Sequence, residues 1–190
     1  MVSEAPVGVL AIQGDYEAHQ RALEAVGRPS VRVKTRAHLE GVGGLVLPGG
    51  ESTTMLTLMS NEGLLEPLAE ACRSGIPVLG TCAGAILLAT RVSNPEQTSL
   101  GVLDMAIERN GYGRQIDSFV THLSSPDPAL DELEAVFIRA PIIRELGESV
   151  TPVLEHDGHP VLVRSGDVWA ATFHPEMTSD TRVLDAVFGS

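Results

Sequence analysis

The sequence predicts an α/β fold: a mostly parallel sheet flanked by helices, with antiparallel strands added in the second half. In the first half, apolar runs of strand length alternate with segments that carry apolar residues at helical spacing, and this alternation is typical of a parallel sheet. After about Ser93, short strand-like pieces follow one another between turn signals, without repeats or a low-complexity linker. A length of 190 residues favours a single domain over 1–190.

In the first half, the strand Val7–Ile12 is continuously apolar, as expected for a strand buried on both faces. The helix that follows should end at Gly27, a typical C-cap. A later helix should begin after Pro48-Gly49-Gly50, with Ser52 or Thr53 as its N-cap. The expected elements are strand 7–12, helix 15–26, strands 31–33 and 45–47, a helix from about 52, helix 64–73, strand 76–79 and helix 85–89.

The second half should add its strands to the same sheet rather than form an independent domain. Turn signals such as Ser125-Pro126-Asp127-Pro128 and Asp157-Gly158 separate the pieces. The expected strands lie at 105–109, 116–123, 136–139, 153–156, 161–164 and 168–173. Cys72 lies on the amphipathic helix 64–73 and is most simply a core residue.

Gly80-Thr81-Cys82-Ala83-Gly84 is the most informative segment of the chain. It lies between a predicted strand and a predicted helix, and G-x-C-x-G in that place is the thiol version of the nucleophile elbow. The two glycines remove Cβ atoms where strand and helix crowd together. The helix that follows favours a thiolate at its N-terminus. The alternative is a buried structural cysteine.

Phe173-His174-Pro175-Glu176 supplies the partner that a reactive thiol needs. Pro175 biases His174 toward extended conformations, in which residues i and i+2 project to the same side. Glu176 can then reach the imidazole and hold it, as the acid does in a Ser-His-Asp triad. The alternative is a solvated turn with a chance His and Glu, which the elbow makes the weaker interpretation.

Together with Pro48–Thr54, these two motifs resemble the class I (triad) glutamine amidotransferases. More narrowly, the chain resembles the glutaminase subunits of pyridoxal 5′-phosphate synthase from about Val7 to Arg182. Ile86 stands where many class I domains have Gln, which disfavours the subunits that serve GMP, CTP or carbamoyl phosphate synthesis. Further segments that carry the resemblance are 12–14, 108–110, 112–119 and 137–141.

The resemblance implies a flavodoxin-like three-layer fold and hydrolysis of L-glutamine to L-glutamate and ammonia. Cys82 would be the nucleophile, His174 the proton shuttle and Glu176 the acid that orients it. The oxyanion donors should be the backbone N–H groups of Ala83 and of the Gly49-Gly50 turn, at Gly50. The resemblance implies that glutamine contacts Gly50, Glu51, Ser52, Arg109, Ile138 and Arg139.

Composition limits the partners and the compartment. A formal net charge of −12 argues against nucleic acid, and no apolar run is long enough to cross a membrane. No secretory signal opens the chain, and two cysteines leave no disulfide framework, so we expect a cytoplasmic protein. We expect neither a cofactor nor a metal. The resemblance implies a large hetero-oligomer with a pyridoxal 5′-phosphate synthase subunit.

Two alternatives remain at this point. One is the glutaminase half of another amidotransferase such as imidazole glycerol phosphate synthase, which Ile86 and the segment 112–119 disfavour. The other is a redox or chaperone-like protein with a reactive elbow cysteine; those related domains have His after the cysteine, where this chain has Ala83. For a glutaminase, the Gly49-Gly50 turn is a predicted switch, because two glycines let a peptide flip at low steric cost.

Overall fold

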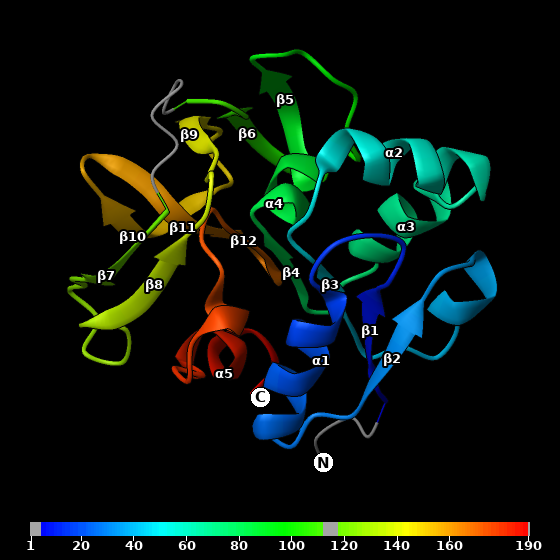
Figure 1. Cartoon of the computed structure of the whole chain (residues 1–190), viewed down its shortest axis with the longest axis horizontal. Coiled ribbons are helices and arrows are strands. Elements are labelled where there is room, and N and C mark those ends of the chain that lie inside the picture. The colour runs from blue at the N-terminus through cyan, green and yellow to red at the C-terminus, as the bar shows by residue number, and fades with distance from the viewer. Residues whose placement is uncertain (1–4, 112–117, 190) are drawn as a thin grey trace.

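The computed structural model describes residues 5–111 and 118–189 (Figure 1). At its centre is a seven-stranded sheet in the order β10-β11-β12-β4-β3-β1-β2. The five strands from β12 to β2 in this order are parallel to one another, whereas β11 is antiparallel to both β12 and β10. Their bounds are β1 (Val7–Leu10), β2 (Ser30–Val33), β3 (Gly44–Leu47), β4 (Val78–Thr81), β10 (Thr151–His156), β11 (His159–Ser165) and β12 (Val168–Ala171). The predicted α/β class is confirmed.

Helices cover both faces of this sheet. Side chains alternate between the faces of a strand, so Leu45 and Leu47 of β3 join one core cluster and Val46 joins the other. The first cluster includes side chains of α2 (Ser52–Asn61), α3 (Leu65–Cys72) and α4 (Ala83–Leu88), and the second includes those of α1 (Tyr16–Ala25) and α5 (Arg182–Phe188). The result is the three-layer arrangement seen in Figure 1.

The prediction that all strands of the second half join the central sheet is wrong. β5 (Ala89–Ser93), β6 (Leu103–Glu108) and β9 (Ile142–Leu146) form a separate three-stranded sheet, and β7 (Phe119–Leu123) pairs only with β8 (Leu133–Phe137). The alternating buried residues of β6 pack into the first core cluster and those of β8 into the second. These strands therefore cover the core instead of lengthening the sheet.

Several boundaries also differ from the sequence-based expectations. Strand β12, expected to be antiparallel, is parallel to β4. The predicted helix 85–89 ends at Leu88, because Ala89 begins β5. β5 and β9 were not expected, since charged residues such as Arg144 interrupt their apolar runs. Residues 112–117, which carry part of the resemblance and the start of the predicted strand 116–123, lie outside the described residues.

Other expectations are confirmed. Helix α1 ends just before Gly27, whose φ of 70° is the left-handed conformation of a helix C-cap. Cys72 is 1% exposed in the core, and burial raises the pKa of its thiol to about 12. The described part of the chain also contains two short 3₁₀ turns, η1 (Arg36–Leu39) and η2 (Pro175–Met177). None of the helices in 5–111 and 118–189 combines the length and apolar character that a bilayer crossing needs.

Candidate active site

Cys82 occupies a strained turn between β4 and α4. Its φ of 48° and ψ of −102° lie outside the regions that L-residues normally adopt. A Cβ at Gly84 would lie 1.9 Å from the carbonyl oxygen of Leu47, and a Cβ at Gly80 would lie 2.6 Å from Cδ1 of Leu88. Both glycines therefore lie so close to neighbouring atoms of β3 and α4 that no side chain fits at these positions. The turn has the geometry expected of a nucleophile elbow.

His174 and Glu176 form a buried pair beside the elbow. Nδ1 of His174 lies 2.7 Å from Oε1 of Glu176, and both side chains are almost fully enclosed. The backbone between them is not extended as expected: Pro175 starts the 3₁₀ turn η2, and His174 is its N-cap residue. The turn brings the carboxylate back to the ring, so the predicted pair forms through a different backbone geometry.

Electrostatics favour a charged imidazolium at His174. Burial would lower its pKa, but the neighbouring Cys82 and Glu176, the latter hydrogen-bonded to Nδ1, raise the pKa to about 10. Burial likewise opposes ionisation of Glu176, yet the neighbouring His19 and His174 leave its pKa below the usual value. In this structure the thiol of Cys82 is directed at the carbonyl oxygen of Ile138, with 3.9 Å between Sγ and O.

The Gly49-Gly50 turn packs against a second loop at residues 13–15. The N–H of Asp15 donates to the carbonyl oxygen of Gly49 at 3.0 Å, and the side-chain oxygen of Gln13 accepts from the N–H of Glu51 at 2.8 Å. A Cβ at Gly49 would lie 2.5 Å from Cε1 of His174. The turn thus comes close to the imidazole, and glycine is required for that approach.

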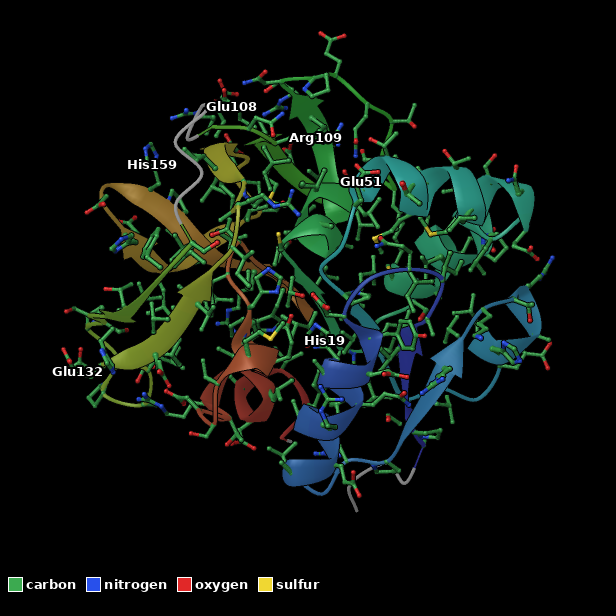
Figure 2. All side chains as sticks on the ribbon, viewed as in Figure 1. His19, Glu51, Glu108, Arg109, Glu132 and His159 are labelled. Atoms are coloured by element: carbon green, nitrogen blue, oxygen red, sulfur yellow. The ribbon has the colours of Figure 1, made fainter. Side chains whose placement is uncertain are left out.

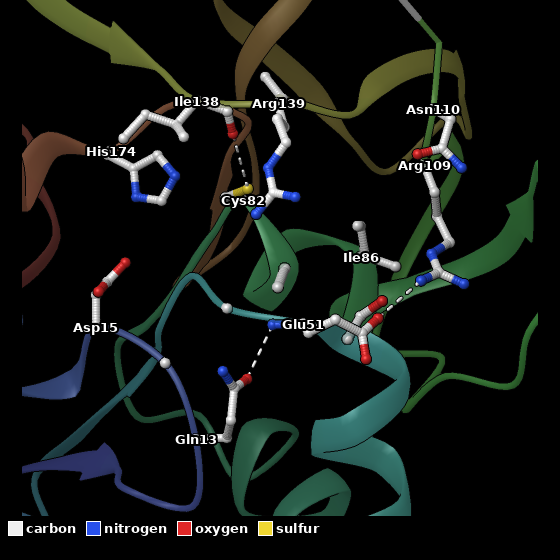
Figure 3. A pocket seen from close by; sticks show the side chains of 15 residues that line it. Gln13, Asp15, Glu51, Cys82, Ile86, Arg109, Asn110, Ile138, Arg139 and His174 are labelled. Carbon is white, nitrogen blue, oxygen red and sulfur yellow. Dashed lines mark hydrogen bonds and ion pairs between the residues drawn. The ribbon is translucent and has the colours of Figure 1, made fainter. Parts of the chain in front are cut away.

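The elbow, the pair and the turn border one cavity of about 440 Å³ (Figure 3). It contains every predicted site residue except Glu176, which lies behind His174. The lining residues are Gln13, Gly14, Asp15, Gly50, Glu51, Ser52, Cys82, Ala83, Ile86, Arg109, Asn110, Ile138, Arg139, Ala140 and His174.

Three of the residues implied to bind glutamine, Glu51, Arg109 and Ser52, are already engaged. Helix α2 begins at Ser52 as expected, but the Glu51 carboxylate accepts from the backbone N–H groups of Thr53 and Thr54, so Glu51 and not Ser52 or Thr53 is its N-cap. Hydrogen bonds from Thr54 in particular lower the pKa of Glu51 to about 2. Arg109 donates to the same carboxylate at 3.1 Å. The hydroxyl of Ser52 donates to Gln97.

Arg139 differs from these residues because its guanidinium forms no ion pair with any residue in 5–111 or 118–189. Its φ of 46° is strained, and its side chain reaches into the cavity beside Cys82 (Figure 3). A planar cation in this position can bind a carboxylate through two hydrogen bonds.

Four residues at or near the cavity have no role predicted from the sequence: Gln13, Asp15, Asn110 and His19. The first three line the cavity, whereas His19 is fully buried behind it on α1. The signal for His19 was a histidine among the apolar positions of a predicted helix. Asp15, His174 and Glu176 are the cluster in the described parts of the chain whose spacing could suit a metal ion. Because His174 and Glu176 are already bonded to each other, we assign no metal to it.

Comparisons with known proteins agree with this geometry. Residues 9–188 match the model of the SNO glutamine amidotransferase family. The chain is 49% identical over 177 residues to the pyridoxal 5′-phosphate synthase subunit PdxT of Thermotoga neapolitana, covering 93% of this chain and 94% of that one. It is 51% identical over 178 residues to the subunit of the same name from Kosmotoga olearia, with 93% of each chain covered. A crystal structure of a glutamine amidotransferase superposes with a TM-score of 0.89 at 43% identity, over 97% of this chain and 99% of that one.

Proposed function

Because this chain belongs to the SNO glutamine amidotransferase family, we propose that it hydrolyses L-glutamine to L-glutamate and ammonia for pyridoxal 5′-phosphate synthesis. The observation that carries the proposal is the meeting of Cys82, His174 and Glu176 at one cavity. A thiol on a strained turn, an imidazole with a raised pKa and a buried carboxylate are the parts that amide hydrolysis through a thioester requires.

The reaction has two halves. In the first, the sulfur of Cys82 attacks the side-chain amide carbon of glutamine, and His174 protonates the departing amine, so that ammonia leaves and a γ-glutamyl thioester remains. In the second, His174 takes a proton from water as the water attacks the thioester, which releases glutamate and restores the thiol. Glu176 holds the imidazole in place through the bond to Nδ1.

Backbone N–H groups would stabilise the negative oxygen that forms in each half. The N–H of Ala83 follows the nucleophile directly, and the second donor is the N–H of Gly50. Both residues line the cavity with Cys82.

The rest of the cavity would hold the amino acid end of glutamine. The guanidinium of Arg139, which has no ion-pair partner among the described residues, is suited to the α-carboxylate. Glu51 and Arg109, which form an ion pair, line the same cavity (Figure 3). Glu51 can meet the ammonium, and Arg109 can share the carboxylate with Arg139. Ser52 and Ile138 complete the substrate contacts that we assign.

The ammonia would pass to a synthase subunit. The relatives that share about half of their residues with this chain are named as subunits of pyridoxal 5′-phosphate synthase, and they match over nearly their whole length. We therefore propose a hetero-oligomer with such a synthase subunit, large in size and located in the cytoplasm.

Glutamate release by the purified chain with a synthase partner tests the function. We expect Cys82→Ala and His174→Asn each to remove nearly all activity, because the loss of one member of a catalytic unit costs about as much activity as the loss of the whole unit. Glu176→Gln should cost less, since a Cys–His pair can ionise without its orienting acid. Cys72→Ser is the matched control: it changes the other cysteine, buried in the core, and should leave turnover within about threefold. Wild-type activity in Cys82→Ala would overturn the proposal.

The two alternatives have less support. A redox or chaperone-like role does not account for the buried His174–Glu176 pair or for the guanidinium of Arg139 in the cavity. A glutaminase for imidazole glycerol phosphate synthase is disfavoured by Ile86, which lines the cavity, and by the names of the relatives. Glutamate release in the presence of each candidate synthase partner separates these possibilities.

A further inference from the structure

A second buried histidine lies behind the carboxylate of Glu176. His19 is on α1 and points toward the middle of the molecule, with 0% of its surface exposed (Figure 2). Its Nε2 lies 3.0 Å from the hydroxyl oxygen of Thr81 and 3.4 Å from Oε2 of Glu176. The other carboxylate oxygen, Oε1, faces Nδ1 of His174 at 2.7 Å. Two imidazole rings therefore flank one carboxylate, one at each oxygen.

The surroundings of His19 determine which of its nitrogens carries the proton. Nδ1 has no hydrogen-bond partner among the residues that the structure describes, whereas Nε2 faces two oxygen atoms. If Nε2 were unprotonated, its lone pair would face the negative Oε2 of Glu176, which is repulsive. A proton on Nε2 instead provides a donor to Thr81 and Glu176 together. Local geometry thus favours the Nε2–H tautomer.

His19 should also be uncharged. Burial is the main cause that lowers its pKa, and it outweighs the opposing charge of Glu176. Oε2 of Glu176 is buried and makes no hydrogen bond in the described residues, and Nε2 of His19 lies 3.4 Å from it, so a neutral N–H there is placed to supply the missing donor. It does so without a second positive charge that would compete with the imidazolium of His174 for the carboxylate.

We propose that His19 is a positioning residue of the glutaminase site: its Nε2–H holds Oε2 of Glu176 and thereby fixes the carboxylate against His174. Nε2 of His19 also contacts Thr81, the residue just before Cys82. His19 therefore links the position of the Glu176 carboxylate to that of the turn that carries the nucleophile. The inference rests on the proposed function of the triad and adds a fourth residue that acts only through Glu176.

Two amide substitutions give the sharpest test. The side-chain nitrogen of Gln reaches about as far from the backbone as Nε2 of His, whereas that of Asn reaches only about as far as Nδ1. In the complex with a synthase subunit, we expect His19→Gln to keep kcat/KM for glutamine within about threefold of wild type. His19→Asn and His19→Leu should lose about tenfold or more, as expected when a hydrogen bond to a charged group is lost. Equal values for Gln and Asn would overturn the proposal.

A double-mutant cycle distinguishes positioning from packing. In a Glu176→Gln background, His19→Leu should change kcat/KM by less than about twofold, since the group that it supports has lost its charge. The same loss in both backgrounds would mean that His19 acts through the general packing of α1. Leu23→Ala is the matched control, because Leu23 is fully buried one turn further along α1; it should lower the melting temperature but leave kcat/KM within about threefold.

The unmodified protein gives an independent measurement. The imidazole nitrogen resonances of His19 in a long-range ¹H–¹⁵N spectrum should show a neutral ring protonated at Nε2. A neutral ring protonated at Nδ1, or a charged ring at neutral pH, would overturn the proposal even if every His19 variant failed to fold. If Cys82→Ala stays active, the proposed function fails. If the triad is essential but His19→Leu is as active as wild type, only the positioning role fails.

Discussion

At the residue scale, the cationic side chains of the cavity differ in how free they are to bind substrate. Arg139 has no ion-pair partner in the described residues, whereas Arg109 is paired with Glu51. Arg139→Ala should therefore raise KM for glutamine or lower kcat/KM. The change should correspond to a loss of binding free energy of about 1.5–3 kcal/mol, the value of a hydrogen bond to a charged group. Glu51→Ala should fall in the same range. Steady-state kinetics of glutamate release measure both changes.

Arg91 is the control for these substitutions. It lies on β5, is half exposed, and pairs with Asp104 and Glu145 away from the cavity. Arg91→Ala should leave the kinetics nearly unchanged, because exposed ion pairs contribute little. Equal effects at Arg91, Arg139 and Glu51 would show that our assignment of the substrate pocket is wrong.

At the element scale, the strand–elbow–helix unit depends on Gly84. An added Cβ would lie 1.9 Å from the carbonyl oxygen of Leu47, so β3 and α4 would have to separate. We expect Gly84→Ala to destabilise the protein by about 1–3 kcal/mol or more and to displace Cys82. Urea unfolding followed by circular dichroism measures the loss. Gly63→Ala is the control, since its Cβ would meet open space and only its positive φ opposes the change. An equal loss at both positions would contradict the steric argument.

The start of α2 should depend on pH through Glu51. Its pKa is lowered to about 2, mainly by the hydrogen bond from Thr54, so the ionised carboxylate stabilises the folded state above the unfolded pKa of about 4.5. This contribution is lost as pH falls from there toward about 2. Glu51→Gln should therefore lower the melting temperature clearly at about pH 7 and by a smaller amount at about pH 3.

Thermal unfolding of both proteins across this range measures the difference. Glu66→Gln is the control, because Glu66 is an exposed carboxylate in the first turn of α3. A difference between Glu51→Gln and wild type that stays constant with pH would exclude the capping role of the charge.

At the scale of the whole molecule, a glutaminase without an acceptor for ammonia wastes glutamine, so a regulated site is expected. In this structure the Gly49–Gly50 peptide is held by the N–H of Asp15, on a loop that is partly exposed. A trans peptide directs its C=O and N–H oppositely, so a rotation of this one peptide exchanges the group that it presents to the site. Loss of one oxyanion donor costs about 10²–10³ in rate.

We therefore predict low glutaminase activity for the chain alone and a rise of at least about tenfold with a stoichiometric synthase subunit. Steady-state glutamate release with and without that subunit measures the rise. Cys82→Ala with the subunit controls for activity contributed by the partner preparation. Equal kcat in both cases would exclude the switch and leave the triad assignment unaffected.

Features that depend on neighbouring residues could be read from the sequence alone. The elbow Gly80–Gly84, the pairing of His174 with Glu176 and the alternation of strands and helices are local patterns, and the structure has each of them. The cavity also gathers the residues that the resemblance implied. Backbone sterics and side-chain periodicity act over a few residues, which is why such patterns suffice.

What only the tertiary structure decided depends on contacts between distant segments. Strands β5, β6 and β9 form their own sheet, which covers a part of the core instead of lengthening the central sheet. No local sequence pattern shows which part of the core a strand will cover. Glu51 became the cap of α2 and the partner of Arg109 because two loops meet there. His19 reaches Glu176 because α1 packs against η2. A buried polar group takes its role from whichever partner the packing brings within hydrogen-bond distance, and that is a property of the folded chain.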